Sequence, residues 1–326
     1  MHFLKKDHLD LIKNGFHNMS NFKNWISAFR LRTLPLSVSG SVVGSSYAYY
    51  LGFFDFLIFI LIILTTISFQ ILSNLANDYG DGIKGTDNKS RIGPERAIQS
   101  GLISPKEMLY AIFFNALISA VFCISLVWLV FGIDHILMSI LFLILGGISI
   151  YAAITYTMGK SAYGYRAMGD LMVFLFFGLL SVFGTFFLFA KQIDFRLIFP
   201  ASSIGLLSAA VLNLNNMRDL NSDRESNKKT LAVFMGVKYS KIYHYAIIIL
   251  AIILMISFQY IMSFSSVIML SWIAFLPLLF HLKAIYKIEN PKRYDPHLKL
   301  VALSTFVVSL LFASVLVIEQ LHIFNF

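Results

Sequence analysis

The sequence contains little of what soluble proteins carry on their surfaces. Only 13% of the 326 residues are charged, 58% are hydrophobic, and the mean hydropathy is +0.75. Soluble domains carry about 25% charged residues, so this composition excludes an ordinary soluble domain. The single cysteine, Cys123, excludes a disulfide framework and a metal cluster held by thiolates. We interpret Cys123 as a small buried hydrophobic residue.

Long hydrophobic runs fill most of the chain. A transmembrane helix needs roughly 20 apolar residues, whereas the strands of a membrane barrel are about 10 residues long and alternate in polarity. The runs are long and uniformly apolar, which favours helices. They lie near residues 36–54, 57–76, 108–131, 134–156, 170–190, 197–216, 242–262, 266–285 and 300–320. We therefore predict an all-α integral membrane protein, with nine transmembrane helices in a single bundle and one domain over residues 1–326.

The basic residues gather on one side of the predicted bundle. Of the 26 lysines and arginines, all except Lys191 and Arg196 lie in the N-terminal segment or at the ends of the even-numbered helices and the loops that follow them. The positive-inside rule places these parts, and the N-terminus, in the cytoplasm and the C-terminus on the opposite face. This distribution accounts for the net charge of +9. We predict that the lipid bilayer is a partner of this protein and that nucleic acid is not.

Residues 1–30 form a separate segment at the start of the chain. The segment is amphipathic and contains lysines, but it lacks the long apolar core and the small-residue cleavage site of a signal peptide. We predict that it lies at the membrane interface.

Acidic and amide side chains gather at two helix ends on the predicted cytoplasmic side. The chain reads NLANDYGDGIKGTD after the second predicted helix and NLNNMRDLNSD after the sixth. Helical spacings of three and four put the oxygen ligands of each motif on one face; these are Asn74, Asp78 and Asp81, and Asn215, Asp219 and Asp223. Two matched motifs on one side favour a site over solvated helix ends. They are also consistent with duplication of a four-helix unit.

If the two motifs converge, they need a cation between them. Two carboxylates 5 Å apart repel by about 3 kcal/mol at an effective dielectric constant of 20. Oxygen ligands without cysteine or clustered histidine favour Mg²⁺ over zinc. Magnesium takes one or two carboxylates and completes its shell with substrate phosphates. The predicted ligand is therefore a diphosphate.

Basic residues alternate with the acids, and some of them are expected to neutralise the diphosphate as it leaves. The candidates are Lys84, Arg91 and Arg96 near the first motif, and Arg218, Arg224, Lys228 and Lys229 near the second. A further candidate is Lys160. If the fourth helix continues through YTMGK, Tyr156 and Lys160 point the same way from its end.

These motifs resemble those of the UbiA superfamily of intramembrane aromatic prenyltransferases. Residues 77–87 (NDYGDGIKGTD) are similar to its NDxxDxxxD element, residues 216–223 (NMRDLNSD) to its DxxxD element, and residues 156–160 to its YxxxK element. Within the superfamily, four longer strings resemble the 1,4-dihydroxy-2-naphthoate polyprenyltransferases: RLRTLPLSVSG, ILSNLANDYGDGIKGTD, RIGPERAIQSGLIS and LNNMRDLNSDRESNKKTLAV. One departure is that the acid after Asp81 is Asp87, rather than a residue four positions on.

The resemblance implies transfer of a polyprenyl chain from polyprenyl diphosphate to 1,4-dihydroxy-2-naphthoate, with loss of CO₂, to give demethylmenaquinone in a bacterial cytoplasmic (inner) membrane. The implied Mg²⁺ ligands are Asp78, Asp81, Asp87, Asp219 and Asp223. The implied catalytic residues are Asp78, Asp81, Asp219, Asp223, Lys160 and Tyr156. The implied substrate-binding residues are Asn74, Asn77, Tyr79, Lys84, Arg96, Asn215, Asn216, Arg224 and Lys228. Arg30, Arg32 and Arg96 are candidates for the naphthoate carboxylate.

Two other functions remain open at this point. A 4-hydroxybenzoate or homogentisate prenyltransferase of the same superfamily would carry similar acidic motifs. A cation-coupled transporter would also place acids within the membrane in two echoing halves, but a transport path needs access from both faces, and the acids lie on one. A CDP-alcohol phosphotransferase is excluded because its DGxxAR signature is absent from the sequence.

Overall fold

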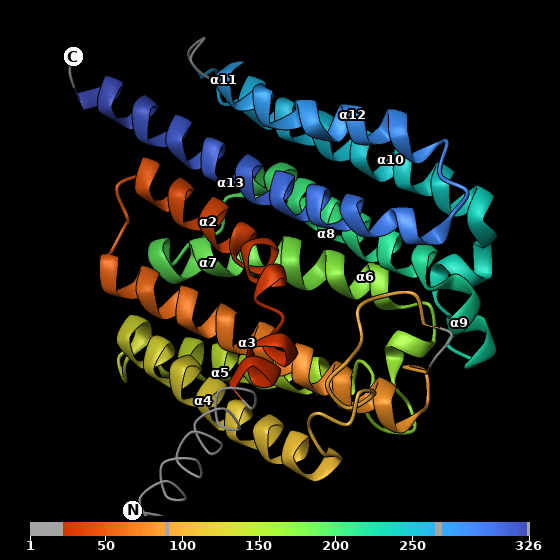
Figure 1. The fold of residues 1–326 in the computed structure, drawn as a ribbon. Coiled ribbons are helices and arrows are strands. Elements are labelled where there is room, and N and C mark those ends of the chain that lie inside the picture. Colours follow the sequence, from red (N-terminus) through yellow and green to blue (C-terminus); the bar gives the residue numbers. More distant parts are fainter. Residues whose placement is uncertain (1–21, 89–90, 265–268, 325–326) are drawn as a thin grey trace, which may run out of the picture.

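The computed structural model describes residues 22–88, 91–264 and 269–324, and these residues form a bundle of long helices that run roughly side by side (Figure 1). The long helices are α2 (Leu34–Tyr50), α3 (Phe56–Ile83), α4 (Pro105–Phe131), α5 (Ile136–Thr155), α8 (Ile198–Arg218), α10 (Leu231–Ile261) and α13 (Tyr294–Phe324). One further long helix is built from α6 (Gly169–Val173), the π-helical stretch η3 (Phe174–Leu180) and α7 (Ser181–Ala190).

Shorter elements lie before or between the long helices of the described residues. They are α9 (Leu220–Glu225), α11 (Met269–Trp272), η6 (Ile273–Phe275), α12 (Leu276–Ile285) and the single turns η1 (Leu31–Thr33), η2 (Tyr163–Tyr165), η4 (Phe195–Leu197) and η7 (Pro291–Arg293). In the described part of the chain, β structure is limited to one isolated bridge between Arg166 and Lys229. The prediction of an all-α fold is confirmed.

Seven helices are long and apolar enough to cross a membrane within the described residues, so the predicted count of nine is not confirmed. The seven are Phe56–Ile83, Pro105–Phe131, Ile136–Thr155, Gly169–Ala190, Phe195–Arg218, Leu231–Ile261 and Pro291–Leu321. The run predicted at 36–54 forms α2, which has only 17 residues. The run predicted at 266–285 is divided, within its described residues, among α11, η6 and α12.

Side-chain caps fix where several helices begin. The Ser104 hydroxyl accepts the backbone N–H of Glu107, whose carboxylate accepts the N–H of Ser104 in return, and this capping box starts α4. Asp55 caps α3 and Thr230 caps α10 in the simpler one-way form. These local signals place the loops as well as the helices.

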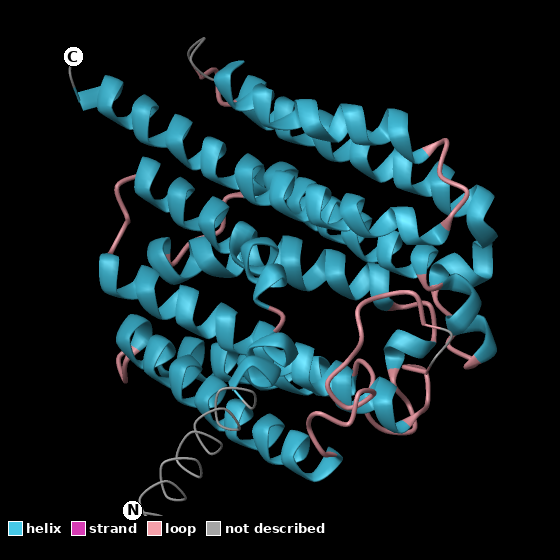
Figure 2. Cartoon of the chain, in the orientation of Figure 1, coloured by secondary structure: helices cyan, strands magenta, loops and turns pink. Residues whose placement is uncertain are grey.

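The connections of the bundle differ between its two ends. Figure 2 shows the long loops gathered at one end, where α3 leads to α4, α5 to α6, and α8 through α9 to α10. We call this the motif end, because both acidic motifs lie there. Lys191 and Arg196 lie at the other end, between α7 and α8.

Small residues let α2 pack deep inside the bundle. A Cβ on Gly40 would lie 2.6 Å from the carbonyl oxygen of Phe177, and one on Gly44 would lie 2.6 Å from that of Val182. Such close contacts between backbones are typical of helices packed within membranes. The main core lies around α2, α8, α10 and α13, and a smaller cluster joins α3 to α4 near the motif end.

A chain of three histidines joins α10, α12 and α13 beside the second motif. His244 Nε2 lies 2.8 Å from His281 Nε2, and His281 Nδ1 lies 2.9 Å from His297 Nδ1. The Asn213 side-chain amide of α8 donates to the Ser240 carbonyl and lies 3.4 Å from His244 Nδ1. Each neutral imidazole has one N–H and one acceptor nitrogen, so the chain is satisfied when every ring is neutral. It fixes α8 relative to the three later helices.

The predicted interfacial segment is only partly described. Residues 22–29 are helical, with Ala28 buried and Trp25 and Phe29 packed against the smaller cluster. Residues 1–21 lie outside the described part of the chain, so the interfacial assignment stays a prediction.

Candidate active site

The first motif lies on an unbroken helix. Helix α3 extends to Ile83, and the expected shared face is confirmed, because Asn74, Asp78 and Asp81 are all buried. The motif therefore turns its oxygen ligands into the bundle rather than towards solvent.

The second motif lies across a helix break. Helix α8 ends at Arg218, Asp219 has non-helical backbone angles, and α9 begins at Leu220. The helix is therefore not continuous through this motif. Two i→i+4 hydrogen bonds nevertheless bracket the break, from Asp219 N to Asn215 O and from Asp223 N to Asp219 O. Asp219 and Asp223 consequently stay buried near one another.

Two cations join the motifs. Lys228 Nζ lies 3.1 Å from Asp81 Oδ2 and 3.9 Å from Asp223 Oδ1. Arg91 Nε lies 2.8 Å from Asp87 Oδ1, and its Nη2 lies 3.7 Å from Asp219 Oδ2. Ion pairs thus join α3 and the loop that follows it to the α8–α10 segment.

Asp81 has a different partner at each of its two carboxylate oxygens. The Tyr165 hydroxyl donates to Asp81 Oδ1 at 2.7 Å and lies 2.6 Å from Thr86 Oγ1. Two cations lie near the Tyr165 ring, with Lys84 Nζ 4.2 Å and Lys228 Nζ 5.3 Å from its centroid. Tyr165 therefore fixes one carboxylate oxygen while the other faces Lys228.

Asp219 is paired with its own neighbour. Arg218 donates to both carboxylate oxygens at 2.9 and 2.7 Å, and also to Asp295 at 2.7 Å and to Asn215 Oδ1 at 2.8 Å. A Cβ on Gly93 would lie 2.5 Å from Arg218 Nη2. The tethered guanidinium cannot move away easily, so the first loop needs glycine there.

Asp78 is held by backbone groups instead. Its carboxylate accepts the N–H groups of Ala97 and Ile98 at 3.2 and 3.4 Å, which fastens the α3–α4 loop to α3. One turn earlier, the Asn74 amide donates to the Phe29 carbonyl and to the Thr33 hydroxyl. Asn74 thus anchors the segment that leads into α2, a structural contact rather than an exposed binding group.

Burial raises the pKa values of two carboxyls outside the membrane-spanning helices. Burial raises the pKa of Asp223 to about 7, and repulsion from Asp219 and Asp81 acts in the same direction against Lys228. Burial also raises the pKa of Asp87 to about 6, with help from Asp81. Burial alone would lower the pKa of Lys228, but Asp81 and Asp223 hold it above its ordinary value.

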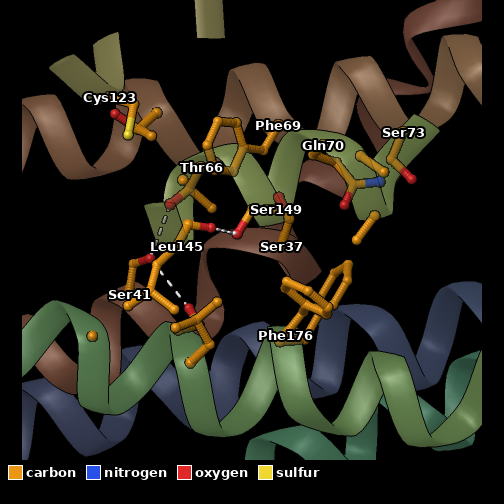
Figure 3. Close-up of a pocket in the computed structure, with 18 of the residues that line it drawn as sticks. Ser37, Ser41, Thr66, Phe69, Gln70, Ser73, Cys123, Leu145, Ser149 and Phe176 are labelled. Carbon is orange, nitrogen blue, oxygen red and sulfur yellow. Dashed lines mark hydrogen bonds between the residues drawn. The ribbon is translucent and has the colours of Figure 1, made fainter. Parts of the chain in front are cut away.

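An apolar cavity of about 350 Å³ begins beside the first motif. Asn77 and Tyr156 line the end near the acids, and Ile62, Cys123 and Leu188 line it further along α3, α4 and α7. Figure 3 shows Phe69, Phe176 and several hydroxyl side chains directed into the cavity. From Asn77 to Ile62 along α3 is about 22 Å at 1.5 Å per residue. The cavity therefore has the shape and polarity to hold a long apolar chain.

A second pocket, of about 560 Å³, opens at the motif end, and Tyr165 is among the residues that line it. Its lining residues, which define what we call the basic pocket, are Lys84, Lys160, Ala162, Tyr165, Arg166, Ser226, Asn227 and Lys229. The expectation that Tyr156 and Lys160 point the same way is wrong. Helix α5 ends at Thr155 and Gly159 turns the chain with φ +81°, so Tyr156 lines the apolar cavity and Lys160 the basic pocket.

Several predicted residues form no hydrogen bond or ion pair with the carboxylates in the described part of the chain. Tyr79 packs against the small hydrophobic cluster between α3 and α4, and Arg224 and Arg32 are exposed. Asn216 is buried at the end of α8. Arg96 is nearer, with its Nε 3.9 Å from Asp87 Oδ2.

The structure also adds residues that motif reasoning did not select. Tyr165 and Thr86 contact the Asp81 network, and Asp295 pairs with Arg218 from the start of α13. Tyr165 lies in the string YGYR that follows the predicted YxxxK element, which was its only sequence signal. Asp295 lies in the first turn of α13, outside any motif, and only the fold reveals its contact with Arg218.

The described residues fit a magnesium ion whose coordination shell is completed by phosphate. In residues 22–88, 91–264 and 269–324, no three Asp, Glu, His or Cys side chains form a group that would hold a metal ion. Instead, the carboxylates of the two motifs face each other across Lys228 and Arg91. All of their potential metal-ligand atoms are oxygens. Asp87 Oδ2 is buried and makes no hydrogen bond to the described residues, as a cation ligand would be. Buried Arg30 Nη2 is likewise unpaired, which suits an anion.

Comparison with known proteins agrees with this arrangement. The model of the UbiA prenyltransferase family matches residues 37–310. The 1,4-dihydroxy-2-naphthoate octaprenyltransferase of Escherichia coli (strain K12) is 46% identical over 227 residues, covering 69% of this chain and 73% of the relative. The protein of the same name from Haemophilus influenzae is 38% identical over 301 residues, covering 89% of this chain and 94% of the relative.

The fold also has a solved counterpart. The apo structure of a UbiA homolog from Aeropyrum pernix K1 superposes with a TM-score of 0.64 at 14% identity, covering 86% of this chain and 99% of that one. Since the family match spans most of the chain and the Haemophilus relative covers nearly all of it, this protein belongs to the UbiA prenyltransferase family.

Proposed function

We propose that this membrane enzyme transfers a polyprenyl chain from polyprenyl diphosphate to 1,4-dihydroxy-2-naphthoate, with loss of CO₂, to give demethylmenaquinone. The observation that carries the proposal is the meeting of Asp81 and Asp223 across Lys228, beside the end of an apolar cavity. The identity to naphthoate octaprenyltransferases favours this acceptor over 4-hydroxybenzoate and homogentisate.

In this proposal, Asp78, Asp81, Asp87, Asp219 and Asp223 provide the oxygen ligands for Mg²⁺. Bound Mg²⁺ would supply Lewis-acid stabilisation of the diphosphate as its bond to the allylic carbon breaks. Lys228 and Arg91 already lie between carboxylates, and each has hydrogen-bond donors to offer to the leaving oxygens. Tyr165 keeps Asp81 oriented while these contacts change.

The apolar cavity would hold the prenyl chain and keep water from the reacting carbon. Tyr156 lines the cavity near the acids, so its ring could stabilise positive charge at the allylic carbon through its π face. For the acceptor, Arg30 is a better candidate than Arg32, because Arg30 Nη2 is buried and unpaired whereas Arg32 is exposed. Arg30 would pair with the naphthoate carboxylate and orient the ring.

We further propose that all nine predicted helices cross a bacterial cytoplasmic membrane, with the motif end and the N-terminus in the cytoplasm and the C-terminus on the opposite side. Helix α2 is short, but Tyr47 near its end bonds Asp194 between α7 and α8, at the end opposite the motifs. Its start lies beside Asn74. The α10–α12 pair is likewise joined near both ends, by Lys241 to the Ile288 carbonyl and by Gln259 to Ser271.

The direct test is incubation of purified protein with Mg²⁺, polyprenyl diphosphates of several lengths, and either dihydroxynaphthoate, 4-hydroxybenzoate or homogentisate. Mass spectrometry of the lipid products should show prenylated, decarboxylated product from dihydroxynaphthoate alone, and none after chelation with EDTA. Product from another acceptor would change the substrate assignment.

A transporter is the second class to test. Liposomes containing the same preparation should show no cation flux. Mg²⁺-independent flux without any product would contradict the enzyme proposal.

A further inference from the structure

The basic pocket has an unusual charge balance. Four of its lining side chains are cationic, namely Lys84, Lys160, Arg166 and Lys229, and none of the described residues that line it is acidic. The carboxylate site shows the opposite arrangement, because each of its inner cations is paired with acids. Cytoplasmic loops tend to be basic for topological reasons. That tendency alone does not explain why cations from three separate loops line the same pocket.

Backbone pairing forces two of these cations together. Arg166 and Lys229 form a parallel bridge, and the N–H of Ala167 donates to the Lys229 carbonyl at 2.7 Å. Paired strands lie about 4.8 Å apart, and like charges on adjacent strands repel. This repulsion between Arg166 and Lys229 arises where two long loops meet. An anion bound beside both side chains would relieve it.

Tyr165 contacts both sites, because its hydroxyl donates to Asp81 and its side chain is part of the lining of the basic pocket. Lys84 is held by the Thr157 carbonyl at 2.6 Å and lies over the Tyr165 ring, while Lys228 lies near the same ring but bonds Asp81. The two lysines therefore belong to different sites. Lys228 belongs to the carboxylate site, and Lys84 faces the basic pocket.

We propose that the basic pocket is a second anion site, which binds a phosphate group presented from the motif end and is separate from the one between the carboxylates. Arginine offers a planar fork to phosphate oxygens, and lysines add point charges. Free diphosphate and the phosphate of a lipid head group share this chemistry. The proposal goes beyond prenyl transfer and does not depend on it, since binding is measured without turnover.

The test measures binding of inorganic pyrophosphate to the purified full-length protein by calorimetry in EDTA. Without divalent metal, Lys228 and Arg91 remain paired with acids, so the basic pocket is the stronger site. The double variant Arg166→Gln and Lys229→Gln should bind pyrophosphate about tenfold more weakly, which is about 1.4 kcal/mol. The matched control is Lys292→Gln with Arg293→Gln, which removes two charges from exposed residues of the α12–α13 connection and should bind as wild type does.

A second arm separates the two sources of phosphate. Protein in nanodiscs of neutral lipid is compared with protein in nanodiscs containing phosphatidylglycerol, and retained lipid is counted by native mass spectrometry. Loss of pyrophosphate binding alone in the double variant assigns the pocket to free diphosphate, and loss of retained phosphatidylglycerol alone assigns it to lipid. Unchanged binding of both ligands, or equal weakening in the control, would overturn the proposal. Thermal melts confirm that each variant is folded.

Discussion

Asp78 and Asp219 occupy matching places in the two acidic motifs, yet different kinds of partner hold them. Asp78 accepts two backbone N–H groups of the loop that follows its own helix. Asp219 is clamped by the guanidinium of Arg218. Backbone amides cannot be removed by a side-chain substitution, whereas a guanidinium can. The first motif is therefore anchored through main chain and the second through side chains.

The inner acids behave alike. Asp81 and Asp223 both face Lys228, so each motif supplies one carboxylate to the shared centre. The outer pair, Asp78 and Asp219, instead contacts groups of its own segment. We propose that the inner pair carries the chemistry and that the outer pair also holds the site together.

The largest effect is expected from the inner pair. Asp81→Asn or Asp223→Asn keeps the shape of the side chain but removes a charge facing the diphosphate, so turnover should fall about 1,000-fold, or about 4 kcal/mol. Formation of demethylmenaquinone by mass spectrometry is the measurement. Asp55→Asn, at the other end of α3 in an exposed cap, is the matched control and should retain activity. A rate within tenfold of wild type in either inner variant would contradict the proposed role.

A smaller effect, on stability rather than rate, distinguishes the outer pair. Arg218→Gln would leave Asp219 buried without its main cation, and breaking a buried pair costs about 3–5 kcal/mol. Asp78→Asn keeps one oxygen acceptor for the loop amides and should cost about 1–3 kcal/mol. Denaturant titration of the purified protein in detergent measures both. The control Asp295→Asn, whose side chain is 44% exposed, should cost less than about 1 kcal/mol. Equal losses in all three variants would remove the distinction.

Local periodicity was enough to predict the first motif. A helix that continues through Asp81 must place Asn74, Asp78 and Asp81 on one face, and α3 does so. Apolar runs likewise predicted where the long helices lie. Their number was less accessible, because α2 is only 17 residues long and depends on its neighbours to be held across the bundle.

Contacts distant in sequence could not be predicted from spacing. Tyr165 is 84 residues from Asp81, and Lys228 is 147 residues from it, so only the packed bundle pairs them. The Tyr156 and Lys160 prediction was wrong for a local reason. Gly159 takes a positive φ that ends the helical spacing on which the prediction rested.

The smallest expected effect is a pH dependence that comes from Asp223. The folded pKa of Asp223 is about 7, whereas an unfolded aspartate titrates near 3.9. Between these values the folded protein binds more protons than the unfolded protein, so stability should fall as pH rises through about 7. The slope is at most about 1.4 kcal/mol per pH unit for one group. Melting temperatures of the metal-free protein from pH 6 to 8.5 measure it.

Asp223→Asn should flatten this slope, because the amide does not titrate, whereas Asp55→Asn should leave it unchanged. Mg²⁺ with pyrophosphate should restore stability at pH 8, since a bound cation favours the ionised carboxylate that burial disfavours. A wild-type melting temperature that does not change across this range would mean that Lys228 fully compensates the burial of Asp223. Asp223 would then be ionised before any metal arrives, and it would not need to release a proton to bind one.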